Sequence, residues 1–588
     1  MNDIIPPGQK EIRIPGSNKL TRIIKSFGAT EKFLFGVLSL LAGITALYML
    51  WNINQSFMVP VPARGGEHIE GVVGFPRFIN PILALTDTDR DLTNLIYSGL
   101  MKYENGKIVP DLARSYTISE DGLVYTFTLK DTVKFHDGTS VTSDDIEFTI
   151  LKAQDSTLKS PRRAAWEGVV VEKVDARQIK FILKKPYTPF LDNTTIGILP
   201  KHIWKNVEGS DQFTFSQFNI EPIGSGPYKI EDITRDNGGL PQYYTLVPYS
   251  KYATNAPYIS TITVHFYPNE KTLIEALTRG DIQAIHGISP KEAATISEEQ
   301  TNSVVERSPL PRIFGVFFNQ NQAPVLANKE VRQALNIAVD REAIVQEVLN
   351  GYGIAIDSPL PSSLATPRQD SVTSSSTERI AEARAILEKA GWTLDSNGIY
   401  VKKSKTATQV LSFSISTTNA PELKRAAELV QETWKKVGAD VTVRVFESGD
   451  LSQNIIRPRK FDALLFGEVI GRDLDLYGFW HSSQRNGTGL NIAMYINAKA
   501  DKLLEDARIE NDEKARIAKY HEFESIIRDD IPAVFLYSPE FIYITPKTLK
   551  GVAIQDITMA ADRWNNVRNW YIRTDNVWKI FVADTTTQ

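Results

Sequence analysis

The sequence predicts an α/β protein with more than one domain, preceded by one N-terminal transmembrane helix. Its 588 residues exceed the usual domain length of about 100 to 200 residues several times over. Between residues 64 and 310 the chain alternates short strands and turns, and after residue 310 helices and strands follow one another. The third observation is the stretch 33–51, which carries no charged side chain. A single compact domain is therefore not expected.

The uncharged segment 33–51 predicts a transmembrane helix. Nineteen apolar-rich residues that rise ~1.5 Å each come close to the ~30 Å hydrocarbon core of a bilayer. Six basic residues precede it against three acidic ones: Lys10, Arg13, Lys19, Arg22, Lys25 and Lys32 against Asp3, Glu11 and Glu31. Because basic flanks stay in the cytoplasm, we expect residues 1–32 to be a cytoplasmic segment, residues 52–63 a linker and the rest of the chain an extracytoplasmic domain.

The alternative for this segment is a cleaved signal peptide. The basic region is long for a signal peptide, and Met49, Leu50 and Trp51 form a poor cleavage site because signal peptidase needs small residues there. We favour a retained anchor. The protein is then expected in the cell membrane with a single pass, with its N-terminus in the cytoplasm.

The composition excludes several classes of function. The absence of cysteine excludes disulfides, thiolate metal sites, a cysteine nucleophile and a lipid-modified cysteine anchor. Lysine and arginine number 66 against 70 aspartates and glutamates, so no basic excess is available for nucleic acid. The seven histidines never pair at the spacing of a helical zinc motif, and no phosphate-binding G-x-x-x-x-G-K-S/T run occurs. We therefore expect no nucleic-acid partner, no metal, no cofactor and no ATPase activity in this chain.

In the first part of the soluble region, alternating apolar and polar residues predict β-hairpins. Segments 124–130 and 133–142 alternate in this way. The Asp-Gly pairs at 121–122 and 137–138 accept the positive φ of a tight turn. Further strands are expected at 178–183, 242–247 and 261–267.

In the second part, the hydrophobic periodicity predicts a strand, helix, strand unit. Strands at 411–417 and 441–446 flank a helix at 421–438, which indicates a parallel pair of strands. A further strand at 462–468 opens into a loop that begins at Gly471. Ligands bind at the carboxyl ends of strands in open α/β sheets, so this loop is the candidate site.

Asp473 and Asp475 are the candidate functional residues of that loop. Carboxylates two residues apart are most often solvated loop charges. They can also anchor a cationic group of a ligand, and less often they form a catalytic acid/base pair.

Four blocks of sequence carry a resemblance to a known family. They are PDLARSYTISEDGLVYTFTLKDTVKFHDGTSVTSDDIEFTI (110–150), GSGPYKI (224–230), VRQALNIAVDREAIVQEVLNGYGIAIDSPLP (331–361) and FDALLFGEVIGRDLDLYGFWHSSQRNGTGLNIAMYINAKADKLLEDAR (461–508). In this order they resemble family 5 of the extracellular solute-binding proteins of ABC importers, the class that includes dipeptide- and oligopeptide-binding proteins. The resemblance covers nearly all of the chain from residue 64 onward.

The resemblance implies a two-lobed periplasmic-binding-protein fold of the large class, which has an extra β-rich insert domain. The expected domains are lobe 1 in three parts, 64–107, 219–309 and 536–588; the β-rich insert, 108–218; and the α/β lobe 2, 310–535. In such proteins the lobes close on the ligand about a hinge.

The resemblance also implies a ligand site. An aspartate of the loop after residue 470 pairs with the α-ammonium of a peptide, and Asp473 and Asp475 are the matching positions. Phe75 and Pro76 match the facing edge of lobe 1, whose backbone would add strand-like hydrogen bonds to the peptide. Tyr477 and Trp480, on the same loop as the aspartates, complete the expected ligand-binding set.

The implied function is the capture of peptides for import. Permease subunits with a separate ATPase would be the partners of an anchored, monomeric binding protein that is not an enzyme. Other solutes, such as a nickel chelate, haem or a sugar, remain alternatives. A surface receptor without an importer and an enzyme are the two competing classes.

Overall fold

The computed structural model describes residues 26–299, 301–367, 375–404, 407–472, 474–555 and 557–582. The chain divides into two units. Unit 1 comprises residues 1–63 and 573–588, and unit 2 comprises residues 64–572. Residues 1–25 of the expected cytoplasmic segment, and Asp473, lie outside the described residues.

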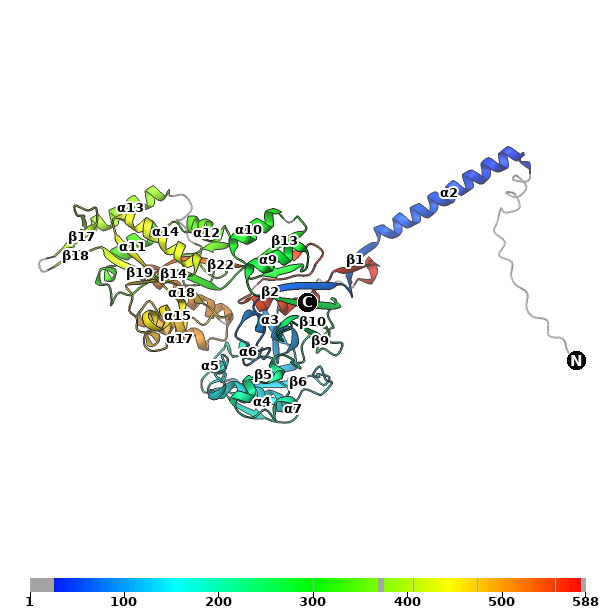
Figure 1. Cartoon of the computed structure of the whole chain (residues 1–588), viewed down its shortest axis with the longest axis horizontal. Helices are drawn as coiled ribbons and strands as arrows, with labels where there is room; N and C mark the ends of the chain where they lie inside the picture. Colours follow the sequence, from blue (N-terminus) through cyan, green and yellow to red (C-terminus); the bar gives the residue numbers. More distant parts are fainter. Residues whose placement is uncertain are drawn as a thin grey trace. The chain divides into compact units, whose positions relative to one another are not determined.

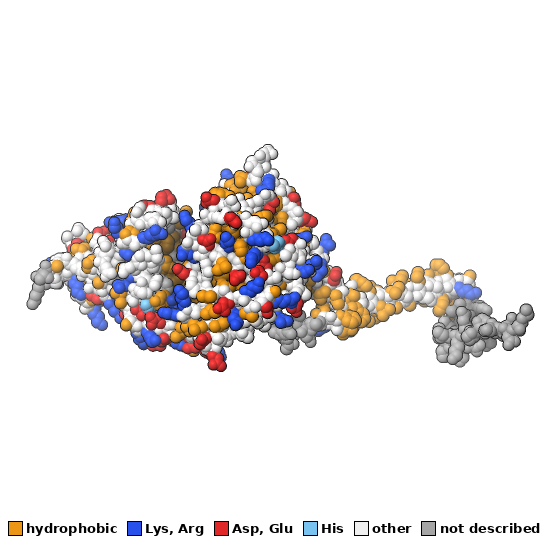
Figure 2. Space-filling view, turned by 90° about the horizontal axis from the view of Figure 1, so that it is seen from below, with side chains coloured by type: hydrophobic (Ala, Val, Ile, Leu, Met, Phe, Trp, Pro, Cys, Tyr) orange, Lys and Arg blue, Asp and Glu red, His pale blue; other side chains and the backbone are white. Residues whose placement is uncertain are grey.

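Unit 1 contains one long apolar helix. Helix α2 (Ala29–Ser56) has 28 residues and buries none of them. It is long and apolar enough to cross a membrane, and Figure 2 shows hydrophobic side chains along most of its visible face. The Glu31 carboxylate accepts a hydrogen bond of 2.7 Å from the backbone N–H of Gly28, which caps its first turn. The helix extends beyond the expected 33–51 at both ends.

The expected linker 52–63 contains a strand after this helix. Strand β1 (Met58–Ala63) pairs antiparallel with β23 (Arg573–Trp578), and a short 3-10 turn, η7 (Lys579–Phe581), follows β23. Pro60 and Pro62 lie two residues apart, so their missing N–H groups face the same edge, and β1 can pair on its other edge alone. The end of the piece 536–588 expected in lobe 1 therefore pairs with the linker.

Unit 2 is built around one mixed sheet of twelve strands. Lobe 1 is built on β2 (Glu67–Val73), β9 (Tyr228–Arg235), β10 (Pro241–Pro248), β11 (Thr261–Tyr267), β12 (Ala284–His286) and β13 (Ser303–Pro309). Lobe 2 is built on β14 (Arg312–Phe318), β15 (Gly353–Ala355), β19 (Ser412–Thr418), β20 (Asp440–Phe446) and β21 (Ala463–Val469). The fold is the predicted two-lobed α/β architecture.

One long strand, β22 (Ala533–Pro546), belongs to both lobes. Its residues 540–546 pair with β13, and its residues 533–537 pair with β14. The chain crosses back at Leu310, whose N–H donates to the Pro539 carbonyl at 3.0 Å and whose carbonyl accepts from the Ser538 hydroxyl at 2.6 Å. Two adjacent strands therefore connect the lobes, which is the geometry of a hinge.

The insert domain consists of a small antiparallel sheet with a helix against it. Its strands are β5 (Ala113–Ile118), β6 (Val124–Leu129), β7 (Val170–Lys173) and β8 (Gln178–Ile182), and a separate hairpin pairs β3 (Met101–Glu104) with β4 (Lys107–Pro110). Alternate residues of β6 and β8 are buried, as the alternating pattern predicts. Helix α4 (Ser143–Gln154) lies close to this sheet in Figure 1.

The remaining helices lie in the two lobes and in the insert domain. Lobe 1 carries α3 (Asp87–Ile96), α9 (Glu270–Arg279) and α10 (Pro290–Glu299), and lobe 2 carries α11 (Lys329–Ala338), α12 (Arg341–Leu349), α13 (Ser376–Lys389), α14 (Pro421–Val437), α16 (Tyr477–Trp480), α17 (Ala498–Ile509) and α18 (Glu513–Asp530). The short helices are α5 (Arg163–Trp166), α6 (Phe190–Asn193), α7 (Lys201–Trp204), α8 (Ser210–Thr214) and α15 (Ser448–Asp450). Between Thr393 and Val410 lies the three-stranded sheet β16 (Thr393–Leu394), β17 (Tyr400–Lys403) and β18 (Thr408–Val410).

The strand, helix, strand prediction in lobe 2 is confirmed. Strands β19 and β20 pair in parallel from Ser412 opposite Asp440, with α14 between them in the chain. Gly438 ends this helix at φ 115°, a left-handed conformation that favours glycine. Buried residues of α14, among them Val430 and Trp434, pack in the lobe 2 core.

Candidate functional site

Two cavities lie between the lobes. The larger, of about 550 Å³, lies beside the hinge and is lined by Asp87, Glu270 and His286 from lobe 1 and by Arg312, Glu422 and Tyr537 from lobe 2 and the shared strand. The smaller, of about 330 Å³, is lined mostly by lobe 1 and the insert domain, and it reaches Gly471 and Arg472 of the loop after β21. The loop singled out from the sequence therefore closes one side of the second cavity.

Arg472 connects that loop to lobe 1. Its Nη2 lies 2.6 Å from Oδ2 of Asp562, and its guanidinium lies 3.7 Å from the centroid of the Tyr103 ring. Asp562 is held in place because the same oxygen accepts hydrogen bonds of 2.7 and 2.8 Å from the N–H and hydroxyl of Thr558. Both ionic side chains are mostly buried, at 16% and 11% exposure. The contact is thus an ion pair that holds lobe 2 to lobe 1 across the cavity.

The floor of the second cavity carries charges of both signs. The Tyr252 hydroxyl donates to Oδ1 of the buried Asp111 at 3.1 Å, and burial lowers the pKa of the nearby Lys102, although Asp111 partly opposes that shift. Arg568 pairs with Glu104 at the same end. A cavity that presents both carboxylates and cations suits a ligand that is itself zwitterionic.

Some residues that line the same cavity carry buried polar groups that make no hydrogen bond within the described part of the chain. They are the hydroxyls of Tyr97 and Tyr103 and the indole N–H of Trp564. Burial without a partner costs about 1 to 3 kcal/mol for such a group.

A buried ionic cluster positions the segment that carries Asp562 and Trp564. This segment, η6 (Ala560–Asn569), is held by Arg563, whose guanidinium bonds Oε1 of Glu70 at 2.6 and 2.9 Å and the carboxylate of Asp91 at 2.7 and 2.8 Å. Burial alone would raise the pKa of Asp91, but Arg563 and His286 lower it to about 2. The cluster keeps both carboxylates ionised inside lobe 1.

Asp475 already has partners in the structure. Nε of Arg508 on α17 lies 2.9 Å from its Oδ1, and the backbone N–H of Tyr477 donates to the same oxygen at 3.2 Å. The Arg508 guanidinium also lies 4.0 Å from the centroid of the Tyr477 ring. Asp475 and Tyr477 therefore fix the shape of the loop. Asp473 lies outside the described residues.

The other expected ligand residues are also set back from the cavities. Trp480 is fully buried and packs against Phe317 and Phe535 in the core of lobe 2. Pro76 is buried and Phe75 is half-buried after the turn that ends β2. Phe75, Pro76, Asp475, Tyr477 and Trp480 do not line the two cavities between the lobes, and their role in ligand binding stays a prediction.

Sequence reasoning missed Arg472, Lys102, Asp111 and Asp562. A signal was present for Arg472, because it is the only cation between Ile470 and Leu476 in a loop already singled out. No local pattern marks Asp562, which lies 90 residues further along the chain and reaches Arg472 only in the folded protein.

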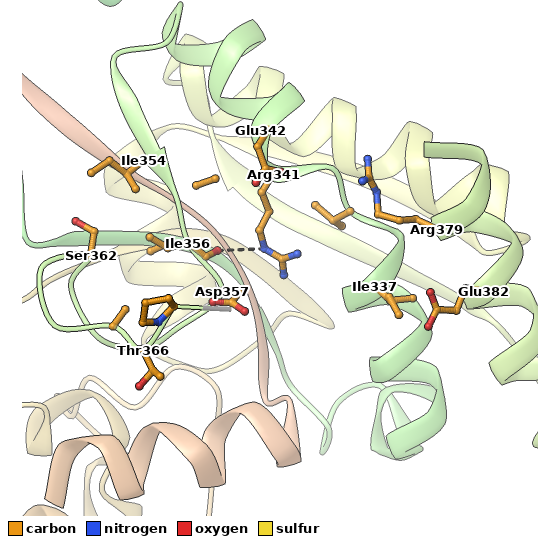
Figure 3. Close-up of a pocket in the computed structure, with 14 residues that line it drawn as sticks. Ile337, Arg341, Glu342, Ile354, Ile356, Asp357, Ser362, Thr366, Arg379 and Glu382 are labelled. Atoms are coloured by element: carbon orange, nitrogen blue, oxygen red, sulfur yellow. Dashed lines mark hydrogen bonds between the residues drawn. The ribbon is translucent and has the colours of Figure 1, made fainter. Parts of the chain in front are cut away.

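A third cavity, of about 390 Å³, lies within lobe 2 and is also lined by charged side chains (Figure 3). Arg341 points across it and donates from Nε to the carbonyls of Ile356 at 3.1 Å and Phe535 at 2.8 Å. Arg379 pairs with Asp340. Because these arginines bind other parts of the same lobe, this cavity is better explained as a junction of α12 and α13 than as a ligand site.

Glu468, in the strand that leads into the loop, offers a pH test of the lobe 2 core. Burial raises the pKa of its carboxyl to about 8, against a smaller opposing effect of the Trp480 indole. A carboxyl whose pKa is raised on folding stabilises the protein fully at pH values below its unfolded pKa. That stabilisation is lost as the pH rises toward the folded pKa.

Replacing Glu468 by glutamine should remove this dependence. From about pH 5 to about pH 7, the free energy of unfolding of the variant should rise by roughly 2 to 3 kcal/mol relative to the wild type, since one pKa unit corresponds to about 1.4 kcal/mol. Urea denaturation of both chains at several pH values measures the difference. A constant difference across this range would show that Glu468 titrates normally.

Known proteins share this sequence pattern and this architecture. Residues 107–491 match the model of the bacterial extracellular solute-binding proteins, family 5 Middle. The oligopeptide-binding protein AppA of Bacillus subtilis (strain 168) is 32% identical over 499 residues, covering 83% of this chain and 89% of AppA.

Two solved structures are similar over most of the chain. One is AppA from Bacillus subtilis in complex with a nonapeptide, with 30% identity, a TM-score of 0.65 and coverage of 87% of this chain and 100% of that one. The other is NikZ from Campylobacter jejuni in complex with Ni(L-His), with 27% identity, a TM-score of 0.65 and coverage of 86% and 99%. The fold is that of a solute-binding protein, and the chain belongs to family 5 of the bacterial extracellular solute-binding proteins.

Proposed function

We propose that this protein binds peptides in the space between its lobes and presents them to an ABC importer. The observation that carries the proposal is the cavity closed by Arg472, which offers both signs of charge. A peptide with free termini has both charges and a row of backbone donors and acceptors. The similarity to an oligopeptide-binding protein supports the same ligand class.

Helix α2 would anchor the protein, with the two lobes outside the cell membrane. The basic residues before the helix and its uncharged length support this topology. The partners are permease subunits with a separate ATPase, and the binding protein is a monomer without catalytic activity. Incubation with peptides and esters should therefore show no turnover, and any hydrolysis that saturates with substrate would contradict the proposal.

Peptide binding should close the hinge and stabilise the fold. A truncated chain that starts at Gly65 should gain about 2.7 kcal/mol of unfolding free energy when peptide is present at about a hundred times its dissociation constant. Small-angle scattering should show contraction because the ligand contacts both lobes. Native mass spectrometry of protein purified from its host would identify the retained ligand.

Each outcome separates one part of this proposal from another. Binding with unchanged scattering would remove the hinge mechanism and leave peptide capture intact. Ni(L-His) is the ligand present in the NikZ structure. If this protein bound Ni(L-His) tightly and bound no di- or oligopeptide, its ligand would be a metal chelate and not a peptide.

A further inference from the structure

The C-terminal segment of unit 1 is fixed to the end of helix α2. Strands β1 and β23 pair along their whole length, from Met58 opposite Trp578 to Ala63 opposite Arg573. Beyond the ladder, the indole N–H of Trp578 donates to Oδ1 of Asn54 at 2.8 Å, and the N–H of Lys579 donates to the carbonyl of Phe57 at 2.8 Å. Residues more than five hundred positions apart therefore form one structure next to the helix.

The end of this structure nearest the helix is apolar and exposed. We call Phe57, Trp578, Ile580 and Phe581 the juxtamembrane patch; these side chains are 57%, 44%, 76% and 73% exposed. The far end of the same strand is polar and reads Arg-Thr-Asp-Asn over residues 573–576. Polarity thus decreases along β23 toward the helix.

We propose that the juxtamembrane patch inserts into the outer interface of the membrane, so that the C-terminal segment is a second membrane contact. This inference rests on the proposed anchoring by α2. If the hydrocarbon core begins at Phe33, about 20 residues cross it and the span ends near Asn52. Phe57 and the residues hydrogen-bonded to it then lie at the level of the lipid headgroups. Trp, Phe and Tyr are the residues enriched there, and Lys579 can reach lipid phosphates.

A lipid surface explains the patch better than a protein partner does. The patch lies directly at the C-terminal end of α2, which itself has no buried residue. Its position is set by hydrogen bonds to the last turn of that helix, so it cannot move away from the bilayer while the helix spans it.

The absence of cysteine in the chain allows a direct test. Ile580→Cys and Phe581→Cys are made singly in the full-length protein and labelled with a thiol-reactive NBD fluorophore. The proteins are reconstituted in nanodiscs of phosphatidylcholine and phosphatidylglycerol, with or without lipids that carry a nitroxide near the headgroup. We expect blue-shifted emission at both positions and several-fold stronger quenching by the nitroxide lipids than at a control position.

Two control positions bracket the expected result. Thr574→Cys lies on the same strand four residues before Trp578, which is ~13 Å at ~3.3 Å per residue, and it should be quenched weakly. Phe215→Cys, at a residue 83% exposed in unit 2, should respond only to aqueous quenchers. The circular dichroism spectrum and the thermal unfolding of each labelled protein verify that it is folded.

The proposal would be overturned if the labels at 580 and 581 responded to aqueous quenchers as the label of Phe215→Cys does, in nanodiscs that hold the inserted helix. That result would point to a protein partner. Failure of the full-length chain to enter nanodiscs would remove the anchor and this inference together. Peptide binding measured on the same samples tests the proposed ligand independently.

Discussion

Replacing Arg563 by methionine is expected to lower the free energy of unfolding by roughly 3 to 5 kcal/mol. The guanidinium is fully buried between Glu70 and Asp91, whose side chains are 0% and 1% exposed. Its removal leaves two carboxylates in a low-dielectric interior without their counter-charge, and this costs more than the attraction alone. Urea denaturation of the chain that starts at Gly65 measures the loss.

A surface pair supplies the matched control. Arg235 pairs with Glu221 at 2.8 Å, with side chains 32% and 43% exposed. Arg235→Met should cost no more than about 1 kcal/mol, because solvent already screens this pair. Equal losses of unfolding free energy for the two variants would show that the buried Arg563 cluster stabilises the fold no more than a surface ion pair does. Combining Arg563→Met with Glu70→Gln and Asp91→Asn should recover part of the stability.

The Arg563 effect should also depend on pH in a defined direction. The pKa of Asp91 is lowered to about 2 in the folded protein, and that of Glu70 is lowered as well. A group whose pKa is lowered on folding contributes stability above its unfolded pKa and loses it as the pH falls through the folded value. The gap between wild type and Arg563→Met should therefore be largest near neutral pH and shrink on acidification.

Asp473→Asn is expected to weaken peptide binding by about two orders of magnitude, or roughly 2.7 kcal/mol. We propose that one loop aspartate receives the peptide ammonium in the closed cleft, where a charge-assisted pair is poorly screened. Asp475 is already engaged by Arg508 and the Tyr477 N–H. We therefore assign the role to Asp473 and expect Asp475→Asn to change binding little. Isothermal titration calorimetry with one peptide measures both.

The ligand provides the complementary test. Acetylating the amine of the peptide should weaken the wild type strongly and Asp473→Asn hardly at all, because the contact is already lost in that variant. Small and equal losses for both substitutions, or full binding of acetylated peptide, would show that the loop aspartates are surface charges. The ligand would then be held by the groups around Lys102 and Asp111.

Local patterns predicted the elements that depend on short-range physics. The strands β19 and β20 with α14 between them follow from hydrophobic periodicity and from Gly438, which ends the helix. The apolar helix follows from the absence of charge between residues 33 and 51. The loop after β21, part of which closes the cavity, follows from its place at the carboxyl end of a strand. Family resemblance added the two-lobed fold.

The details of the site depend on contacts that no local pattern encodes. Trp480 packs in the lobe 2 core against Phe535, and its expected contact with the ligand stays a prediction. A tryptophan in a loop has the same sequence signal in either place, and only the packing of the neighbouring elements decides between them.

The sequence by itself determined the α/β class, the apolar N-terminal helix and the loop on which a site residue was to be sought. Each of these depends on residues close together in the chain. Only the tertiary structure decided that Arg472 reaches Asp562, that Arg563 joins Glu70 to Asp91, and that β23 pairs with β1. These contacts join positions 90 to more than 500 residues apart. Their free energy depends on burial and desolvation, which exist only once the lobes and the two chain ends have come together.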